Sequence, residues 1–248
     1  HDADLAVVLL HQLLHRRVDA LAERAGKVER LDDRDRRARR TIDQAGLEAA
    51  AAHLADHPRF RRDAQPLGDA IISLLIGGDS PDYRLSPEFA EALVAQVLDA
   101  CEQLRGRCLV TTSRRTSPEV ERRLEDRLAA SAHCRLLLLA SRDLLNGTLE
   151  GMLGLAKVVV VTAESVSMVT EACASGRRVI VVEPPARSVG ERQTKARRLL
   201  KTITAEGYAQ LCAVGELASA IRAALSQDPP ARRLDTYGLI QDAVRRLL

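Results

Sequence analysis

Short apolar runs alternate with helical patterns along most of this 248-residue chain, and the alternation is the strongest constraint on its fold. Five runs have the composition of buried strands: AIISLLI (70–76), RCLVT (107–111), RLLLLA (135–140), KVVVV (157–161) and RRVIVV (177–182). Strands that alternate with helices predict βαβ units and a parallel sheet. Because the runs are almost continuously apolar, both faces of the sheet should be covered. We expect an α/β fold, a Rossmann-like parallel sheet flanked by helices.

Start signals mark two of the intervening helices. Ser86-Pro87 and Ser117-Pro118 each combine an N-cap serine with a proline at the first helical position. We expect further helices at 148–156, 195–207, 215–227 and 236–248, with 208–214 as a short connecting segment.

The composition excludes several classes of protein. Aromatic residues make up only 2% of the chain, so stacking platforms for single-stranded nucleic acid are not expected. The net charge is +3, and acidic residues nearly balance an arginine-rich basic set, which argues against nucleic acid as a partner. The five cysteines lack CxxC spacing and predict buried free thiols in a reducing compartment. No apolar run approaches the ~20 residues of a transmembrane segment. We expect a cytoplasmic protein, with attachment to the periphery of the inner membrane as an open alternative.

The first 62 residues differ from the rest. DLAVVLL (4–10) has the pattern of a strand, a charge block occupies 31–40, and AGLEAAAAHLADH (45–57) predicts a helix. We therefore expect residues 1–62 to be a remnant or tail of an amino-terminal domain plus a helical linker, and residues 63–248 to be the Rossmann-like domain. Two histidine pairs spaced i, i+4 (His11/His15 and His53/His57) lack a convincing third ligand, so no metal site is expected.

Polar elbows follow three of the expected strands. They are GGDS (77–80), TTSRRT (111–116) and TAESVSM (162–168). Carboxyl ends of parallel strands share one edge of the sheet, where ligands of open α/β folds bind. Glycines, hydroxyls and guanidiniums suit a diphosphate or a similar anion. Two alternatives remain: the glycines could serve a tight turn alone, and Arg114 and Arg115 could be ordinary surface arginines.

The third elbow runs directly into a helix, whose first N–H groups and positive dipole end favour an anion. Glu171 lies on the second turn of that helix, six residues after Ser165, where its carboxylate could reach a sugar hydroxyl beyond a bound phosphate. This pairing suggests a nucleotide. A nucleophilic serine is disfavoured because ESVSM does not match GxSxG, so Ser165 and Ser167 are expected as backbone caps or phosphate donors. The chain contains neither GxGxxG nor GxxxxGK[ST], and we expect no dinucleotide cofactor and no Walker-type loop.

LLIGGDS (74–80), TTSRRT (111–116) and VVTAESVSMVTEACASGRRV (160–179) together resemble the mitochondrial-fission ELM family, which is assigned to the GT-B class of glycosyltransferases. The resemblance covers roughly residues 70–215. It implies that 63–248 is a nucleotide-sugar-binding domain, with Glu171 on the ribose. It implies these substrate-binding residues: Gly77, Gly78, Asp79, Ser80, Ser113, Arg114, Arg115, Thr116, Thr162, Ser165, Val166, Ser167, Met168 and Glu171. The chain departs from the family pattern at Gly147-Thr148, where Pro-Tyr is usual, and at Glu164, where Asp is usual.

We expect a metal-independent GT-B-type glycosyltransferase that binds a nucleotide-diphosphate sugar, incomplete in this chain, with a lipid or saccharide acceptor at a membrane surface. One alternative is a non-catalytic partner-binding or membrane-associated organising module with the same fold. Another is a sugar-phosphate epimerase of related fold, which would need a histidine and paired carboxylates in the cleft. His133 is the only histidine after residue 57, which argues against the epimerase.

Overall fold

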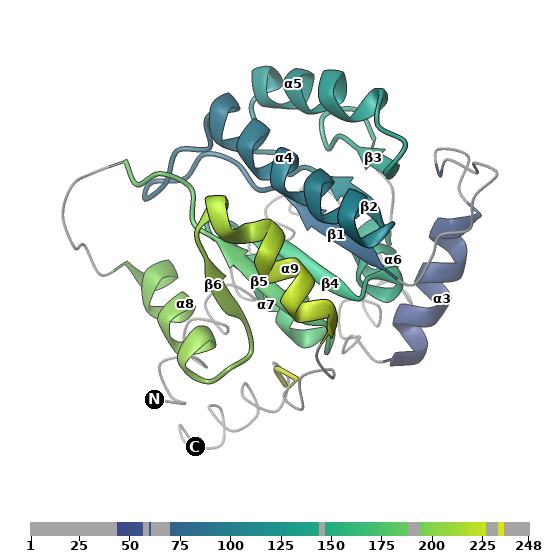
Figure 1. Ribbon diagram of the computed structural model, residues 1–248. Helices are drawn as coiled ribbons and strands as arrows, with labels where there is room; N and C mark the ends of the chain where they lie inside the picture. Colours follow the sequence, from purple (N-terminus) through teal and green to yellow (C-terminus); the bar gives the residue numbers. More distant parts are fainter. Residues whose placement is uncertain are drawn as a thin grey trace, which may run out of the picture.

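Six parallel strands form one sheet in the order β3-β2-β1-β4-β5-β6 (Figure 1). The computed structural model describes residues 44–56, 60, 70–143, 147–187, 194–226 and 233–235. The strands are β1 (Ile71–Leu75), β2 (Arg107–Thr111), β3 (Cys134–Leu138), β4 (Val158–Thr162), β5 (Arg178–Val182) and β6 (Gln210–Cys212). The expected fold class and all five expected strands are confirmed.

The sixth strand was not predicted. β6 lies in the segment that we expected to be a connection, and it has only three residues, two of them exposed. It pairs with β5 at the edge of the sheet. A short edge strand lacks the continuous apolar pattern of a strand with two covered faces, so its sequence resembles that of a loop.

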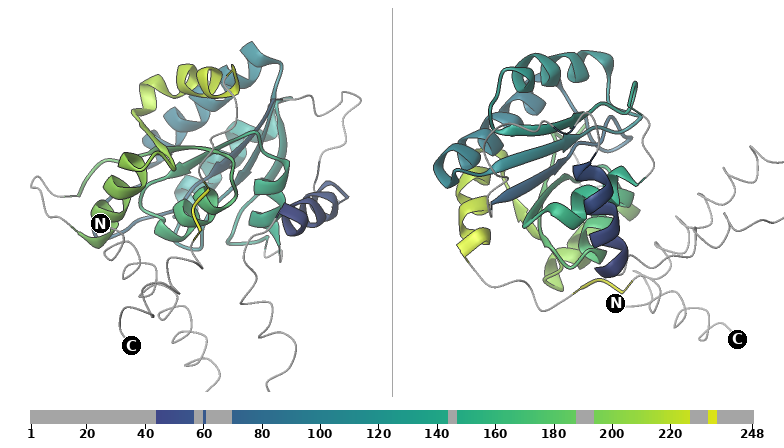
Figure 2. Two further views of the ribbon diagram at one scale, coloured as in Figure 1. Left: turned by 90° about the horizontal axis from the view of Figure 1, so that it is seen from below. Right: turned by 90° about the vertical axis from the view of Figure 1, so that its right-hand side faces the viewer.

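Helices cover both faces of the sheet. One face carries α4 (Pro87–Leu104), α5 (Pro118–Ala129) and α9 (Leu217–Ser226), which follows the 3₁₀ turn Val214–Glu216. The other carries α3 (Gln44–Ala55), α6 (Thr148–Leu155), α7 (Val166–Ala174) and α8 (Lys195–Ala205). In the left panel of Figure 2, α4 and α9 lie on one side of the sheet and α3 and α8 on the other. None of the helices within the described ranges is long and apolar enough to cross a membrane.

Alternate residues of each strand enter two separate cores. On β4, Val159 and Val161 pack toward α6 and α7, whereas Val158 and Val160 pack toward α4 and α9. All four valines are fully buried. This two-sided burial explains why the strands are continuously apolar instead of alternating with polar residues.

The N-cap predictions for α4 and α5 are confirmed, because Ser86 accepts a hydrogen bond from the N–H of Phe89 and Ser117 accepts one from Val120. At the far end of α4 the left-handed residue is Arg105 (φ 50°), one residue before the glycine. Gly106 is needed for a different reason: a Cβ there would lie 2.5 Å from the carbonyl oxygen of Ala70.

Helix α3 packs closely on α6, so the predicted helix at 45–57 covers the domain. Two glycines of α6 allow this approach: a Cβ on Gly151 would lie 2.8 Å from Leu54, and one on Gly154 would overlap the backbone of Leu47. The predicted strand 4–10, His11, His15 and His57, the helix 236–248 and the boundary at 62/63 lie outside the described residues.

The direction of winding reverses between β1 and β4. From β1 the chain proceeds through β2 to β3, and then returns to the other side of β1 to form β4, β5 and β6. In open parallel sheets such a reversal leaves a crevice at the carboxyl ends of the two strands that flank it. Two of the three polar elbows, those after β1 and β4, border this position.

Candidate functional site

The peptide of Gly77 joins the three elbows. Its N–H donates to Thr162 Oγ1 at 2.8 Å, and its carbonyl oxygen accepts a short hydrogen bond from Thr116 Oγ1. Thr162 ends β4 and Thr116 closes the elbow after β2, so the strands on both sides of β1 hold this one peptide. The structure therefore brings the three predicted elbows together at the carboxyl edge of the sheet.

Glycine is required at both positions of the first elbow by the neighbouring elbows. A Cβ on Gly77 would overlap the carboxylate of Glu164 and lie 3.0 Å from Cβ of Ser165, and a Cβ on Gly78 would overlap the backbone of Arg115. We predicted close approach to a ligand or a tight turn for these glycines. The structure shows a further use, which is close approach between the elbows themselves.

The elbow after β2 is a turn fixed by its own hydroxyls. The N–H of Thr116 donates to the carbonyl of Ser113 at 2.9 Å, the N–H of Ser113 donates to Thr116 Oγ1 at 3.0 Å, and the N–H of Arg115 donates to Ser113 Oγ at 3.2 Å. Arg114 and Arg115 are exposed at the tip of this turn. Nη1 of Arg115 donates to the carbonyl of Asp79 at 3.3 Å, which holds this guanidinium over the first elbow.

Asp79 and Ser80 shape the loop after β1. Asp79 Oδ1 accepts from the N–H of Leu85 at 2.9 Å, and Oδ2 forms a short ion pair with Arg187. Ser80 Oγ accepts from the N–H of Tyr83 at 3.1 Å. Both side chains therefore contribute to the conformation of the loop.

The loops after β1 and β5 are joined to each other. Tyr83 and Ala186 form an antiparallel bridge, the N–H of Arg84 donates to the carbonyl of Pro185 at 2.9 Å, and the N–H of Arg187 donates to that of Asp82 at 3.0 Å. Because β4 lies between β1 and β5 in the sheet, this connection passes across the end of β4. It forms a strap, residues 82–84 with 185–187, beside the elbow at 162–165.

Tyr83 anchors the strap. Its hydroxyl donates to Glu183 Oε1 at 2.5 Å, and the guanidinium of Arg197 lies 5.5 Å from the centre of its ring. Burial, with the hydrogen bond and the charge of Glu183, raises the pKa of Tyr83 to about 12. No local sequence pattern connects the members of this group, because they lie up to 114 residues apart.

Helix α7 begins at Val166 without a side-chain cap. Ser165 is the N-cap residue and is buried, but its hydroxyl makes no capping hydrogen bond, so the predicted role as a cap is wrong for this side chain. In contrast, the N-cap residue of α8, Thr194, accepts from the N–H of Arg197. The first turn of α7, including Ser167 and Met168, is half-buried, as is Glu171 on the next turn. This helix start has the polarity that favours an anion.

Glu164 lies at the centre of the three elbows and is only 5% exposed. Its Oε1 accepts from Thr162 Oγ1 at 2.7 Å, and its Oε2 is buried with no hydrogen-bond partner among the described residues. Burial raises the pKa of Glu164 to about 7, against the opposing effects of the Thr162 hydroxyl, its own N–H, the charge of Arg115 and the N–H of Gly78. The sequence showed this residue only as a departure from the usual Asp.

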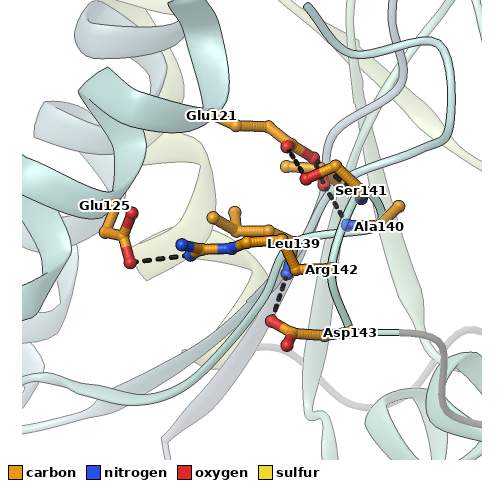
Figure 3. A network of polar contacts seen from close by, with 8 residues as sticks. Glu121, Glu125, Leu139, Ala140, Ser141, Arg142 and Asp143 are labelled. Carbon is orange, nitrogen blue, oxygen red and sulfur yellow. Dashed lines mark hydrogen bonds and ion pairs between the residues drawn. The ribbon is translucent and has the colours of Figure 1, made fainter. Parts of the chain in front are cut away.

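A second buried carboxylate stabilises the neighbouring strand ends (Figure 3). Glu121 of α5 accepts from Thr112 Oγ1 at 2.6 Å through Oε1 and from Ser141 Oγ through Oε2. Thr112 Oγ1 in turn accepts from the N–H of Ala140 at 2.8 Å. These bonds fix the chain after β2 against the loop after β3. Sequence patterns alone did not reveal this network.

The sequence analysis also considered free thiols at the five cysteines and metal ligands at two histidine pairs. All five cysteines are free and buried, as expected. Within the residues that the structure describes, no group of three or more His, Cys, Asp or Glu side chains could hold a metal ion.

Comparison with solved structures gives distant similarities. UDP-GlcNAc 2-epimerase from Methanocaldococcus jannaschii, in complex with UDP-GlcNAc and UDP, is 15% identical over 84% of this chain and 52% of its own, with a TM-score of 0.47. An α,α-trehalose-phosphate synthase (UDP-forming) from Burkholderia vietnamiensis is 16% identical over 83% and 48%, with a TM-score of 0.46. MurG from Acinetobacter baumannii is 19% identical over 75% and 43%, with a TM-score of 0.36. The chain spans about half the length of these structures.

Comparison with sequences gives a family. No curated protein matches the chain. A family model described as mitochondrial fission ELM1 matches residues 21–233, which include all three elbows, the strap and the two buried carboxylates. The chain therefore belongs to the mitochondrial fission ELM1 family.

Proposed function

We propose that the crevice between β1 and β4 binds the diphosphate of a nucleotide-diphosphate sugar, and that the chain provides the donor-binding part of a metal-independent GT-B-type glycosyltransferase. One observation carries the proposal: three polar elbows meet at the carboxyl edge of a parallel sheet, two of them at its reversal point, beside a helix start that has no side-chain cap. Reversal points of such sheets are where open α/β folds bind ligands.

The side chains at this edge suit the parts of such a ligand. The N–H groups of the first turn of α7 and the hydroxyl of Ser167 would receive the phosphate oxygens. The exposed guanidiniums of Arg114 and Arg115 would add positive charge from the elbow after β2. Together they would stabilise the departing nucleoside diphosphate electrostatically, without a bound metal ion.

Glu171 would bind the ribose. It is half-buried on the second turn of α7, one turn beyond the N–H groups proposed to bind the phosphate. A carboxylate accepts hydrogen bonds from sugar hydroxyls but repels phosphate, so its position beyond the first turn separates the two parts of the ligand.

The acceptor and its location belong to the same proposal. In the GT-B arrangement a second domain binds the acceptor, so the catalytic base is not assigned to any residue of this chain. We propose a lipid or saccharide acceptor, presented to a cytoplasmic protein at the periphery of the inner membrane.

The direct test is calorimetric titration with nucleoside diphosphates of all the common bases, together with inorganic pyrophosphate. We expect at least one nucleotide to bind at millimolar concentration or below. No binding of any of them to the folded chain would contradict the proposal.

Glu171→Ala tests the contact with the ribose independently of the contacts with the phosphates. We expect roughly a tenfold loss of nucleotide affinity, the size of one good hydrogen bond to a charged group, and little change for pyrophosphate. Equal losses for both ligands would remove the assignment of Glu171 to the ribose.

Arg115→Ala tests the phosphate contact. We expect about a tenfold loss for nucleotide and pyrophosphate alike, because the guanidinium would serve the part that they share. Arg127→Ala is the matched control: this arginine is exposed in the last turn of the same helix that follows the elbow, at the end distant from the crevice. An equal loss in the control would indicate a general effect of net charge.

A further inference from the structure

We propose that Glu164 is a proton switch in the anion site, so that the crevice takes up one proton when a diphosphate binds. The inference rests on the proposed function, since it concerns the same crevice. It adds a regulation that neither the family nor the fold implies: affinity set by the protonation of a buried acid at the base of the site.

The position of Glu164 couples it to any ligand of the helix start. Its carboxylate packs against Gly77 so closely that a Cβ there would overlap Oε1, and it directly precedes Ser165, the N-cap residue of α7. An anion on the first turn of α7 would therefore lie close to this side chain, which is itself largely excluded from water.

The hydrogen bonds of Glu164 favour its ionised form, but they do not outweigh the effect of its burial. Oε1 receives the Thr162 hydroxyl, but the buried Oε2 lacks a partner within the described ranges. An ionised carboxylate in this position has one oxygen without compensation, which is costly away from water. A second negative charge nearby disfavours the ionised form further. A bound diphosphate should therefore raise the pKa of Glu164 above the value of about 7 that burial gives it in the free chain.

Several charged groups lie on the elements around Glu164. They are Asp79 after β1, Arg114 and Arg115 after β2, Glu171 on α7, and Glu183 and Arg187 after β5. Of these, Arg115 acts on the charge of Glu164 and favours its ionised form. A ligand phosphate that engages Arg115 would weaken this effect, which again favours proton uptake. The histidines of the described residues, His53 and His133, lie in none of the three elbows.

The sign of the pH dependence follows from this linkage. Well below pH 7 Glu164 is already neutral, so affinity should not change with pH. Above pH 7 the free site loses its proton while the occupied site keeps it, so affinity should fall with rising pH, by up to about tenfold per pH unit for one proton. It should become constant again above the pKa of the occupied site.

The experiment is calorimetric titration of the full chain with UDP-glucose, ADP-glucose and GDP-mannose. These probes have no terminal phosphate, whose own titration near pH 6 would otherwise contribute. Each titration is carried out at pH 6.0, 7.5 and 8.5, in two buffers with different enthalpies of ionisation, so that the protons taken up on binding are measured directly. We expect about half to three-quarters of a proton at pH 7.5 and nearly none at pH 6.0.

The outcomes separate the two proposals. Binding with proton uptake at pH 7.5 supports the switch. Binding without proton uptake at any pH overturns the switch and leaves the proposed function intact. If no nucleotide sugar binds at pH 6.0, the proposed function fails and the switch fails with it.

Two variants assign the proton. Glu164→Gln should remove the uptake and hold the affinity at pH 8.5 near its value at pH 6.0. Glu171→Gln, the matched control on α7, should weaken binding while the uptake remains. Uptake that persists in a folded Glu164→Gln chain would overturn the assignment, and if that variant does not fold, the measurements on the unmodified chain still decide whether a proton is taken up.

Discussion

Two threonine–glutamate pairs lie at the same edge of the sheet and differ in one respect. Thr112 donates to Glu121 at 2.6 Å and accepts from the N–H of Ala140 at 2.8 Å; Thr162 donates to Glu164 at 2.7 Å and accepts from the N–H of Gly77 at 2.8 Å. Both glutamates are 5% exposed. The pairs have nearly the same geometry on the threonine side.

The second carboxylate oxygen makes the difference. In Glu121 it accepts from the Ser141 hydroxyl (Figure 3), whereas in Glu164 it has no hydrogen-bond partner within the described part of the chain. A buried carboxylate with all its bonds made stabilises the fold, and one with a bond missing costs stability unless something else compensates. We infer that Glu121 stabilises the fold, whereas the ionised form of Glu164 does not.

The largest effect is expected at Glu121. Glu121→Ala removes the charged acceptor of the buried Thr112 hydroxyl and of the Ser141 hydroxyl on the exposed loop after β3. The free energy of unfolding, measured by urea denaturation, should therefore fall by about 4 kcal/mol. The control is Glu125→Ala on the same helix, which breaks only the exposed ion pair with Arg142 at 2.7 Å. We expect no measurable change in the control. A comparable loss of stability in the two variants would show that the hydrogen bonds of Glu121 contribute no more to stability than the exposed ion pair.

Glu164→Gln should change stability in the opposite direction. In the unfolded chain this carboxyl titrates near 4.5, but the folded chain keeps the proton up to about pH 7. Between these values the folded state binds more protons, so stability falls as the pH rises and remains low above 7. The difference between the two pKa values corresponds to a loss of about 3 kcal/mol in the free energy of unfolding.

A glutamine cannot ionise, so Glu164→Gln should raise the free energy of unfolding at pH 8 by up to about 3 kcal/mol and change it little at pH 5. Denaturation in urea at both pH values measures the difference. Glu121→Gln is the matched control and should destabilise the chain at both. A loss of stability in Glu164→Gln at pH 8 would show that the ionised form is compensated by a contact that we have not recognised.

The contrast also shows which features the sequence could predict. Periodicity and caps such as Ser86-Pro87 predicted the helices, and parallel topology alone placed the three elbows on one edge. Local patterns carry this information, because strands with two covered faces and capped helices have distinctive residue types. β6 could not be found in this way, since a three-residue edge strand with two exposed positions has no such pattern.

The details of the site depend on contacts distant in sequence. The need for glycine at Gly78 comes from the backbone of Arg115, and the strap comes from pairing of Tyr83 with Ala186. Likewise no neighbour in the sequence marks Glu121, which lies on a helix with other acidic residues, or Glu164 as a buried carboxylate. Only the position of Ser141 in the fold distinguishes the carboxylate that is satisfied from the one that is not.

The smallest effects should come from the threonines, and they compare the two pairs most directly. Thr112→Val and Thr162→Val keep the shape of the side chain but remove one donor and one acceptor each, so each should lower the free energy of unfolding at pH 8 by about 2 kcal/mol. The pH dependence of stability should differ between the two variants.

The Thr162 hydroxyl stabilises the ionised form of Glu164, so its loss should move the pKa of Glu164 further above 7. The stability of Thr162→Val should therefore recover toward that of the unmodified chain as the pH falls to 5, where Glu164 is neutral in both, whereas the loss in Thr112→Val should persist. If the free energies of unfolding of the two variants change with pH in the same way between pH 5 and 8, the oxygen of Glu164 that lacks a partner among the described residues has no effect on proton binding.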